Sequence, residues 1–341
     1  MGLMVILRMS IYLSTFLLFC TVACGQERNT ETPMLRPEGT TPIDAVIDTI
    51  KTTAGSPFVV ERTEGIDPRY EPVIKRLVRD GFEETFVRDL FEDDHTVYIP
   101  KMAAVKPRKP VNSSDWYTWV NTDESAQACL DFIATYDSLL SAVEKQYGVD
   151  KETIAALLRC ETRHGTITGD YHVLSVYASM ALMEESWAVS ESVKNAREQM
   201  ADEGKSKAAI DKEVAYIKGR MSKRGGWAYK ELKNLVTIHK NKTMDVRTLN
   251  GSWAGAFGWA QFLPSSYRRL AADGDGDGTI DLYNPADAIH SVANYLDRGG
   301  YVSGSAAKIK KSLKSYNPSN DYANAIYGLS VRVGKGMAAS K

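Results

Sequence analysis

Residues 157–165, LLRCETRHG, place a carboxylate at the end of a run that is typical of a buried helix. The last turn of a helix carries a partial charge of about −0.5, and an apolar neighbourhood also disfavours ionisation, so both effects raise the pKa of Glu161. A glutamate that keeps its proton near neutral pH is suited to general acid catalysis. The competing interpretation is a surface glutamate that pairs with Arg159 or Arg163.

A second stretch, residues 250–262, alternates small residues with aromatic ones. The aromatic members are Trp253, Phe257, Trp259 and Phe262. Glycines allow a backbone to approach a ligand closely, and flat aromatic faces suit the apolar faces of sugar rings. Gln261 offers both a donor and an acceptor. The alternative is a tight packing loop whose aromatic side chains belong to the core.

The segment DGDGDGTIDLYN resembles the acidic half of an EF-hand calcium loop. The expected ligands, in chain order, are Asp273, Asp275, Asp277, Thr279 through its carbonyl group, Asp281 and Asn284. Asn284 replaces the bidentate glutamate of the twelfth place, so we expect a weak, structural Ca²⁺ site. Asn284 also precedes Pro285 and has a rival role as a helix cap. The alternative is an acidic solvated turn.

The elements that position these residues are predicted to be mainly helical. Residues 70–93 indicate two short amphipathic helices broken at Gly81, and residues 124–147 indicate one longer helix. A helix over 151–161 follows, with Gly165 expected to supply the left-handed turn at its end. The next helix begins near Tyr171.

Residues 186–244 contain 13 Lys/Arg and 7 Asp/Glu and are predicted to be an inserted, solvated helical pair. A surface that attracts an anionic polymer is the alternative. The whole chain has a net charge of −1 and 25% charged residues, which argues against a nucleic-acid-binding protein because no global basic field is present.

The N-terminus reads as a secretory signal, residues 1–23, that ends in a segment similar to a bacterial lipobox. Cys24 is the expected lipidation site, with ordinary signal cleavage as the alternative. Residues 24–57 have the composition of a flexible tether. Because Gly25 rather than aspartate follows Cys24, we expect a lipoprotein on the periplasmic face of the outer membrane, or a periplasmic protein if it is not lipidated.

Cys129 and Cys160 are predicted to be buried free thiols. If their helices run antiparallel, they lie roughly 27 Å and 15 Å from the connecting turn at ~1.5 Å per residue. Disulfide-bridged α-carbons lie within about 7 Å of each other, so a bridge is not expected.

Several ordered motifs resemble the membrane-bound lytic murein transglycosylase B family, over roughly residues 70–335. They are ETRHG, GSWAGAFGWAQFLPSSY, the calcium-like loop, NPADAIHSVANYL and SYNPSNDYA. The resemblance implies a mainly α fold with a lysozyme-like core, an EF-hand-like calcium loop and an additional helical subdomain. It also implies a catalytic region over 58–335 that acts on peptidoglycan glycan strands.

The resemblance assigns Glu161 as the single catalytic acid and base. The substrate-binding residues that it implies are Ser252, Gln261, Phe262, Tyr295, Tyr316, Asn317 and Tyr322. Phe257 and Leu263 stand where the family usually has methionines. The arginine pair that the family carries after its catalytic helix has no counterpart in residues 181–187, ALMEESW.

The implied reaction cleaves the β-1,4 bond between N-acetylmuramic acid (MurNAc) and N-acetylglucosamine (GlcNAc) and forms a 1,6-anhydro-MurNAc end. The sequence contains no evident second catalytic carboxylate of the kind that two-carboxylate glycosidases need. A hydrolytic muramidase on the same scaffold and a non-catalytic peptidoglycan-binding lipoprotein are the alternatives.

Overall fold

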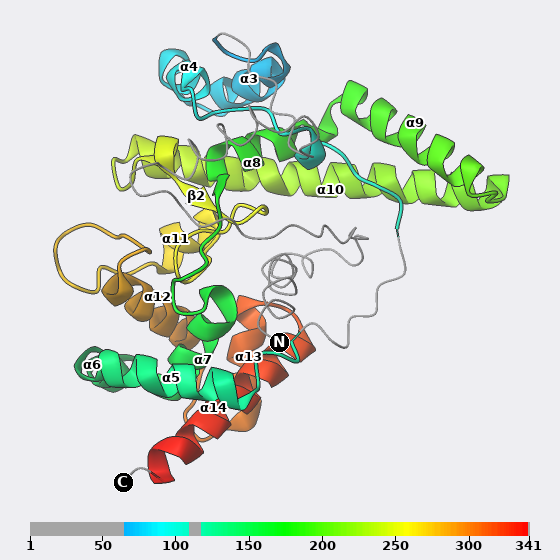
Figure 1. Cartoon of the computed structure of the whole chain (residues 1–341). Coiled ribbons are helices and arrows are strands. Elements are labelled where there is room, and N and C mark those ends of the chain that lie inside the picture. The colour runs from blue at the N-terminus through cyan, green and yellow to red at the C-terminus, as the bar shows by residue number, and fades with distance from the viewer. Residues whose placement is uncertain (1–64, 109–116, 340–341) are drawn as a thin grey trace, which may run out of the picture.

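The computed structural model describes residues 65–108 and 117–339, and it confirms the expectation of a mainly α fold (Figure 1). The α-helices are α3 (Glu71–Arg79), α4 (Glu84–Glu92), α5 (Asp123–Thr135), α6 (Asp137–Tyr147), α7 (Lys151–Thr162), α8 (Val173–Ala181), α9 (Ser186–Asp202), α10 (Lys207–Lys240), α11 (Pro264–Leu270), α12 (Pro285–Arg298), α13 (Ala306–Tyr316) and α14 (Asn320–Ala339). Two short strands, β1 (Tyr171–His172) and β2 (Asn250–Gly251), pair antiparallel. The predicted signal, the tether and Cys24 lie outside the described residues. Within the described residues, no helix is both long and apolar enough to cross a bilayer.

The helices form two groups. Helix α7 packs against α5 and α14, while α12 contacts α6 and α13. The second group is built on α10, which packs against α8, α9 and α11. Figure 1 shows α10 running above α11, with α7, α13 and α14 below. Helices α3 and α4, separated by Gly81 with its φ of 96°, confirm the predicted amphipathic pair.

The prediction of one helix over 124–147 is wrong, because two helices, α5 and α6, meet at Tyr136. Its φ of −114° and ψ of 26° depart from helical values, and its ring packs on Phe132 at a centroid distance of 4.9 Å. Cys129 and Cys160 are free thiols, as expected, although only Cys129 is fully buried and Cys160 is half-buried. Burial raises the pKa of the Cys129 thiol to about 12.

The segment 186–244 contains the predicted helical pair, α9 and α10. One face of α10 is nevertheless part of the core, because Ile217, Met221, Leu232 and Leu235 are all fully buried. Only the opposite face of α10 is solvated, so this helix supports the fold as well as carrying charge.

The end of α7 departs from the expected single left-handed glycine. Arg163 and His164 already have φ values of 51° and 57°, and Gly165 follows at 84°. The His164 ring stacks on Phe132 at a centroid distance of 4.3 Å, and Arg163 lies over Trp119. These contacts hold two residues in a conformation that usually costs about 1–3 kcal/mol each.

Gly165 also allows the Trp259 side chain to lie against the backbone. A Cβ atom at this position would lie 2.0 Å from the indole of Trp259. The turn after Glu161 is therefore packed directly against the aromatic loop.

We expect Gly165→Ala to destabilise the protein more than Gly148→Ala. Both glycines have positive φ, but a Cβ at Gly148 would meet nothing within 4 Å. Backbone strain should lower the free energy of unfolding by roughly 1–2 kcal/mol in both variants, and the clash should add roughly 1–3 kcal/mol at Gly165. Urea denaturation measures both values. Equal losses would show that Trp259 does not constrain this turn.

Candidate active site

Glu161 lies in the last turn of α7 and is only 3% exposed. The hydroxyl of Tyr322, on α14, donates a hydrogen bond to Oε1 of Glu161 at 2.5 Å. Burial raises the pKa of Glu161 well above its ordinary value, and the Tyr322 hydrogen bond lowers it by a smaller amount. Burial therefore favours the protonated form of this carboxyl group over the carboxylate.

Within the described residues, Glu161 forms no ion pair with Arg159 or Arg163, which was the competing interpretation. The guanidinium of Arg159 lies 3.7 Å from Glu124, and that of Arg163 lies 5.3 Å from the centre of the Trp119 ring. Both cations are thus directed to other partners.

An aromatic cluster formed by Phe262, Tyr295 and Tyr316 lies beside Glu161. The rings of Tyr295 and Tyr316 are 4.5 Å apart, and Phe262 is 5.5 Å from Tyr295 and 5.8 Å from Tyr316. Burial raises the pKa of Tyr316 well above its usual value, and the negative charge of ionised Glu161 adds to this rise. The fold therefore brings three of the sequence-predicted residues together near the carboxyl group.

Tyr117 completes this environment on the side of α14. Its ring meets the edge of Tyr322 at a centroid distance of 5.8 Å, and its hydroxyl interacts with the buried side chain of Asn317. Two further predicted residues, Asn317 and Tyr322, thus lie in the same region as Glu161.

The loop over 250–262 is tied to the end of α7. The hydroxyl of Thr162 donates to the carbonyl oxygen of Trp259 at 2.9 Å. Gln261 has a φ of 49°, and its Nε2 donates to the carbonyl oxygens of Thr168 and Gly258, both at 3.0 Å. Its Oε1 is buried and has no hydrogen-bond partner in the described residues. Gln261 therefore has an acceptor available for a ligand.

Ser252 has a different environment from the other predicted residues. Its hydroxyl accepts a hydrogen bond from the backbone N–H of Ala256 at 3.2 Å, and its own N–H donates to the Ala256 carbonyl at 2.7 Å. These bonds hold the loop in shape. The structure thus places Ser252 as a buried loop residue rather than as part of the cluster around Glu161.

The acidic loop is organised by its own carboxylates. Asp273 accepts from the N–H groups of Gly276 and Gly278, at 2.7 and 2.9 Å. Asp277 accepts from the N–H of Thr279 at 2.7 Å, and Asp281 accepts from the N–H of Tyr283 at 2.9 Å. Loop geometry of this kind arranges oxygen atoms, which are the ligands that Ca²⁺ prefers.

Sequence reasoning missed Asp287 as a member of this group. Single carboxylate oxygens of Asp273, Asp275 and Asp287 lie within 4.8 Å of one another. Asp287 is only 1% exposed, and burial raises its pKa. Asn284 has the predicted capping role, because its Oδ1 accepts from the N–H of Ala286 at 2.8 Å. The spacing of Asp287, three residues beyond the twelve-residue template, is the signal that was overlooked.

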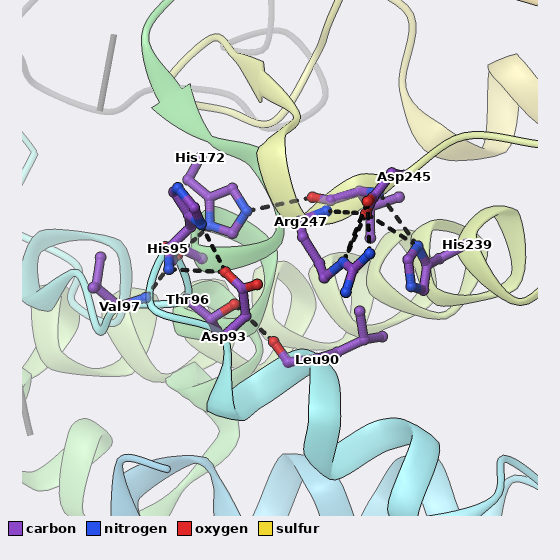
Figure 2. Close-up of polar contacts among 11 residues, drawn as sticks. Leu90, Asp93, His95, Thr96, Val97, His172, His239, Asp245 and Arg247 are labelled. Carbon is purple, nitrogen blue, oxygen red and sulfur yellow. Dashed lines mark hydrogen bonds and ion pairs between the residues drawn. The ribbon is translucent and has the colours of Figure 1, made fainter. Parts of the chain in front are cut away.

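A separate cavity of about 410 Å³ lies between the segment before β2 and the acidic loop. Its lining residues are Thr168, Gly169, Met244, Asp245, Thr248, Leu249, Asn250, Asp281 and Tyr283. One of these lining residues, Asp245, forms an ion pair with Arg247 at 2.8 Å and lies 3.5 Å from His239. Figure 2 shows these three side chains together.

The neighbouring histidines also have structural partners. His172 bridges the hydroxyl of Ser175 and the carbonyl of Val246, and burial lowers its pKa to about 4 (Figure 2). His95 contacts Asp93 at 2.8 Å. This polar cluster thus links chain segments, and the buried proton-retaining carboxyl is found at Glu161 instead.

Comparisons with known proteins show which family this chain resembles. A family model described as a transglycosylase SLT domain matches residues 66–313. The membrane-bound lytic murein transglycosylase B of Escherichia coli (strain K12) is 30% identical over 183 residues, which are 54% of this chain. The match covers 40% of the length of that relative.

Solved structures share the fold. The lytic transglycosylase SltB1 of Pseudomonas aeruginosa has a TM-score of 0.61 and 22% identity, over 79% of this chain and 98% of its own. The Escherichia coli lytic transglycosylase Slt35 in complex with calcium has a TM-score of 0.56 and 20% identity, over 80% of this chain and 96% of its own.

The raised pKa of Glu161 predicts how stability depends on pH. The unfolded chain releases this proton near the ordinary pKa of 4.5, whereas the folded protein retains it to higher pH. Stability from this group is therefore complete below that value and is lost as pH rises through the folded pKa. Because Glu161→Gln cannot ionise, we expect its melting temperature to exceed that of the wild type more at pH 7.5 than at pH 4.

The matched control is Glu191→Gln, which makes the same substitution at an exposed position of α9. For this variant, the difference in melting temperature from the wild type should be the same at pH 4 and at pH 7.5. A gap between Glu161→Gln and wild type that is the same at pH 4 and pH 7.5 would contradict a raised pKa.

Proposed function

The chain belongs to the transglycosylase SLT domain family, and from this premise we propose that it is a lytic transglycosylase that cleaves the MurNAc–GlcNAc β-1,4 bonds of peptidoglycan. The observation that carries the proposal is the buried carboxyl group of Glu161, with its raised pKa and its hydrogen bond from Tyr322. Such a group is a general acid at neutral pH.

Glu161 acts first as the acid. Its proton moves to the glycosidic oxygen, the bond to C1 of MurNAc breaks, and GlcNAc leaves with a free hydroxyl. The acetamido group of the same MurNAc residue supports the positive charge that develops at C1. The negative charge left on Glu161 is stabilised by the Tyr322 hydroxyl, which already donates to it.

Glu161 then acts as the base. The carboxylate takes the proton of the C6 hydroxyl of MurNAc, and O6 bonds to C1 to give the 1,6-anhydro end. Closure within one ring is favoured by proximity. The sequence contains no evident second catalytic carboxylate, and the group that hydrogen-bonds Glu161 is the Tyr322 hydroxyl rather than another acid. This supports a one-carboxylate mechanism over the paired geometry of other glycosidases.

The substrate contacts are assigned to the residues around this carboxyl. Phe262, Tyr295 and Tyr316 offer aromatic faces, and Gln261 offers its free Oε1. We assign Asn317 and Tyr322 to the same site and Ser252 to the loop that borders it. A hydrolytic muramidase would use the same residues with water in place of the C6 hydroxyl.

The acidic loop is proposed to bind a structural Ca²⁺ ion. Asp273, Asp275 and Asp287 bring carboxylate oxygens together, and the solved Slt35 structure is described in complex with calcium. When bound, the ion offsets the mutual repulsion of these carboxylates. Asp277, Thr279, Asp281 and Asn284 stay proposed contributors.

Location in the cell envelope follows from the same proposal. The Escherichia coli relative is named membrane-bound and acts, by its name, on murein. We propose that this chain is held at the periplasmic face of the outer membrane through a lipid on Cys24, with residues 24–57 as the tether to a catalytic region over 58–335.

We expect Glu161→Gln to keep the fold and to lose activity on sacculi by at least about 10²–10⁴-fold, because one group provides both proton transfers. Mass spectrometry of the released muropeptides measures the products. Wild type should give 1,6-anhydro ends. Reducing ends would indicate a hydrolase, and no products would indicate a binding protein.

The control is Glu152→Gln, which changes a half-buried glutamate at the other end of α7 and should stay active. Wild-type turnover by Glu161→Gln would exclude Glu161 as the acid and base.

Calcium should raise the melting temperature of the wild type, because an ion that binds the folded state stabilises it by RT ln(1 + [L]/Kd). We expect a response at roughly 10⁻⁴–10⁻³ M, the weak end for such loops. Asp273→Asn should reduce the response, whereas Asp297→Asn, an exposed site outside the loop, should not. Identical melting with calcium and with chelator would leave the loop as an acidic turn.

A further inference from the structure

A basic surface is formed by side chains of α10 and α11. Its members are Lys223, Arg224, Lys230 and Arg268. Lys223 and Lys230 are exposed and lie seven residues apart, which is two helical turns and about 10 Å along one face of α10. Among the described residues, no ion pair involves Lys223, Lys230 or Arg268.

The acidic residues of α10 do not neutralise this surface. Glu213 is bound by Arg108 at 2.7 Å, and Asp211 lies 3.2 Å from Arg197. Glu231 is buried and accepts from the N–H and hydroxyl of Ser265, at 2.9 and 2.8 Å. The charge of the α10–α11 surface is therefore left to face solvent.

The position of α11 fixes the surface beside the substrate loop. Glu231 holds the first turn of α11, and Arg268 donates from Nη1 to Oδ1 of Asn234 on α10 at 2.6 Å. Helix α11 begins directly after Leu263, so Arg268 is only six residues beyond Phe262 in the sequence.

Arg224 connects the surface to the aromatic loop itself. Its guanidinium lies 5.5 Å from the centre of the Trp253 ring, a cation–π contact. Trp253 belongs to the 250–262 loop that carries Gln261 and Phe262. A ligand bound along this loop thus passes next to fixed positive charges.

We propose that the α10–α11 surface binds the carboxylates of the stem peptides on the glycan strand, and so makes the chain select peptide-bearing peptidoglycan. The inference rests on the proposed function, because the glycan strand is what brings the peptides to this surface. The glycan itself is uncharged in its backbone, whereas its stem peptides end in carboxylates, which lysine and arginine attract.

The test uses the full chain with Lys223→Gln and Lys230→Gln combined. The control combines Lys207→Gln and Lys218→Gln, two exposed lysines on a different flank of the same helix. Each protein is assayed on peptide-bearing glycan strands and on amidated strands, in which carbodiimide coupling to methylamine has made the peptide carboxylates neutral. We expect KM for peptide-bearing strands to rise about threefold to tenfold, as two exposed ion pairs are lost, with kcat unchanged.

On amidated strands the same variant should match the wild type, and raised salt should remove the difference on peptide-bearing strands. An equal rise in KM on both substrates, an unchanged KM on both, or the same rise in the control would overturn the proposal. The proposal would also be overturned if the surface variant lost binding to anionic phospholipid vesicles while its KM stayed unchanged on both glycan substrates.

A binding measurement separates this inference from the proposed function. Co-sedimentation with intact sacculi and with sacculi whose peptide carboxylates have been amidated, using proteins that also carry Glu161→Gln, needs no turnover. Failure of wild type to release any muropeptide would remove the proposed function alone. Equal sedimentation of the surface variant and its parent with intact sacculi would remove the peptide-binding role.

Discussion

The hydrogen bond between Tyr322 and Glu161 is the interaction on which the arrangement of the site depends. A carboxyl group that is 3% exposed is costly to bury without a partner, and an ionised one costs more. The partner comes from 161 residues further along the chain. The burial of Glu161 therefore depends on the docking of α14 on α7 and α5, so the C-terminal helix and the helix that carries Glu161 form one packed unit.

The same constraint explains the backbone at the end of α7. The chain must turn away immediately after Glu161, yet keep the carboxyl group inside. It does so with left-handed residues at Arg163 and His164, each held by stacking on an aromatic ring. Thr162 then bonds to Trp259, and Gly165 leaves room for the Trp259 indole. Strain at the turn is thus balanced by contacts that also position the 250–262 loop.

Local sequence pattern was sufficient to favour a buried position for Glu161 and to predict the helix pairs α3–α4 and α9–α10. These features depend on spacing within a few residues. Features set by distant contacts were not predictable in the same way. The break at Tyr136 arises within an otherwise helical pattern, and Tyr322 could be linked to the site only through family resemblance. Asp287 was missed because burial in α12, rather than a place in a twelve-residue template, brings its carboxylate to Asp273 and Asp275. Ser252 was grouped with the substrate residues through the same resemblance, and that role stays a prediction, since its visible hydrogen bonds lie within the loop.

Composition hides how the charges are used. A net charge of −1 results from separate regions whose environments differ. Burial favours the protonated form of Glu161, and the carboxylates of Asp273, Asp275 and Asp287 stand close together. Lys223 and Lys230 of α10 face solvent, while Glu231 of that helix is bound by Ser265. Dissolved salt screens exposed charges that lie more than about 8–10 Å apart, so these regions act almost independently. One chain of nearly neutral net charge can therefore keep a buried carboxyl group, a cluster of carboxylates and an exposed pair of lysines at three different places.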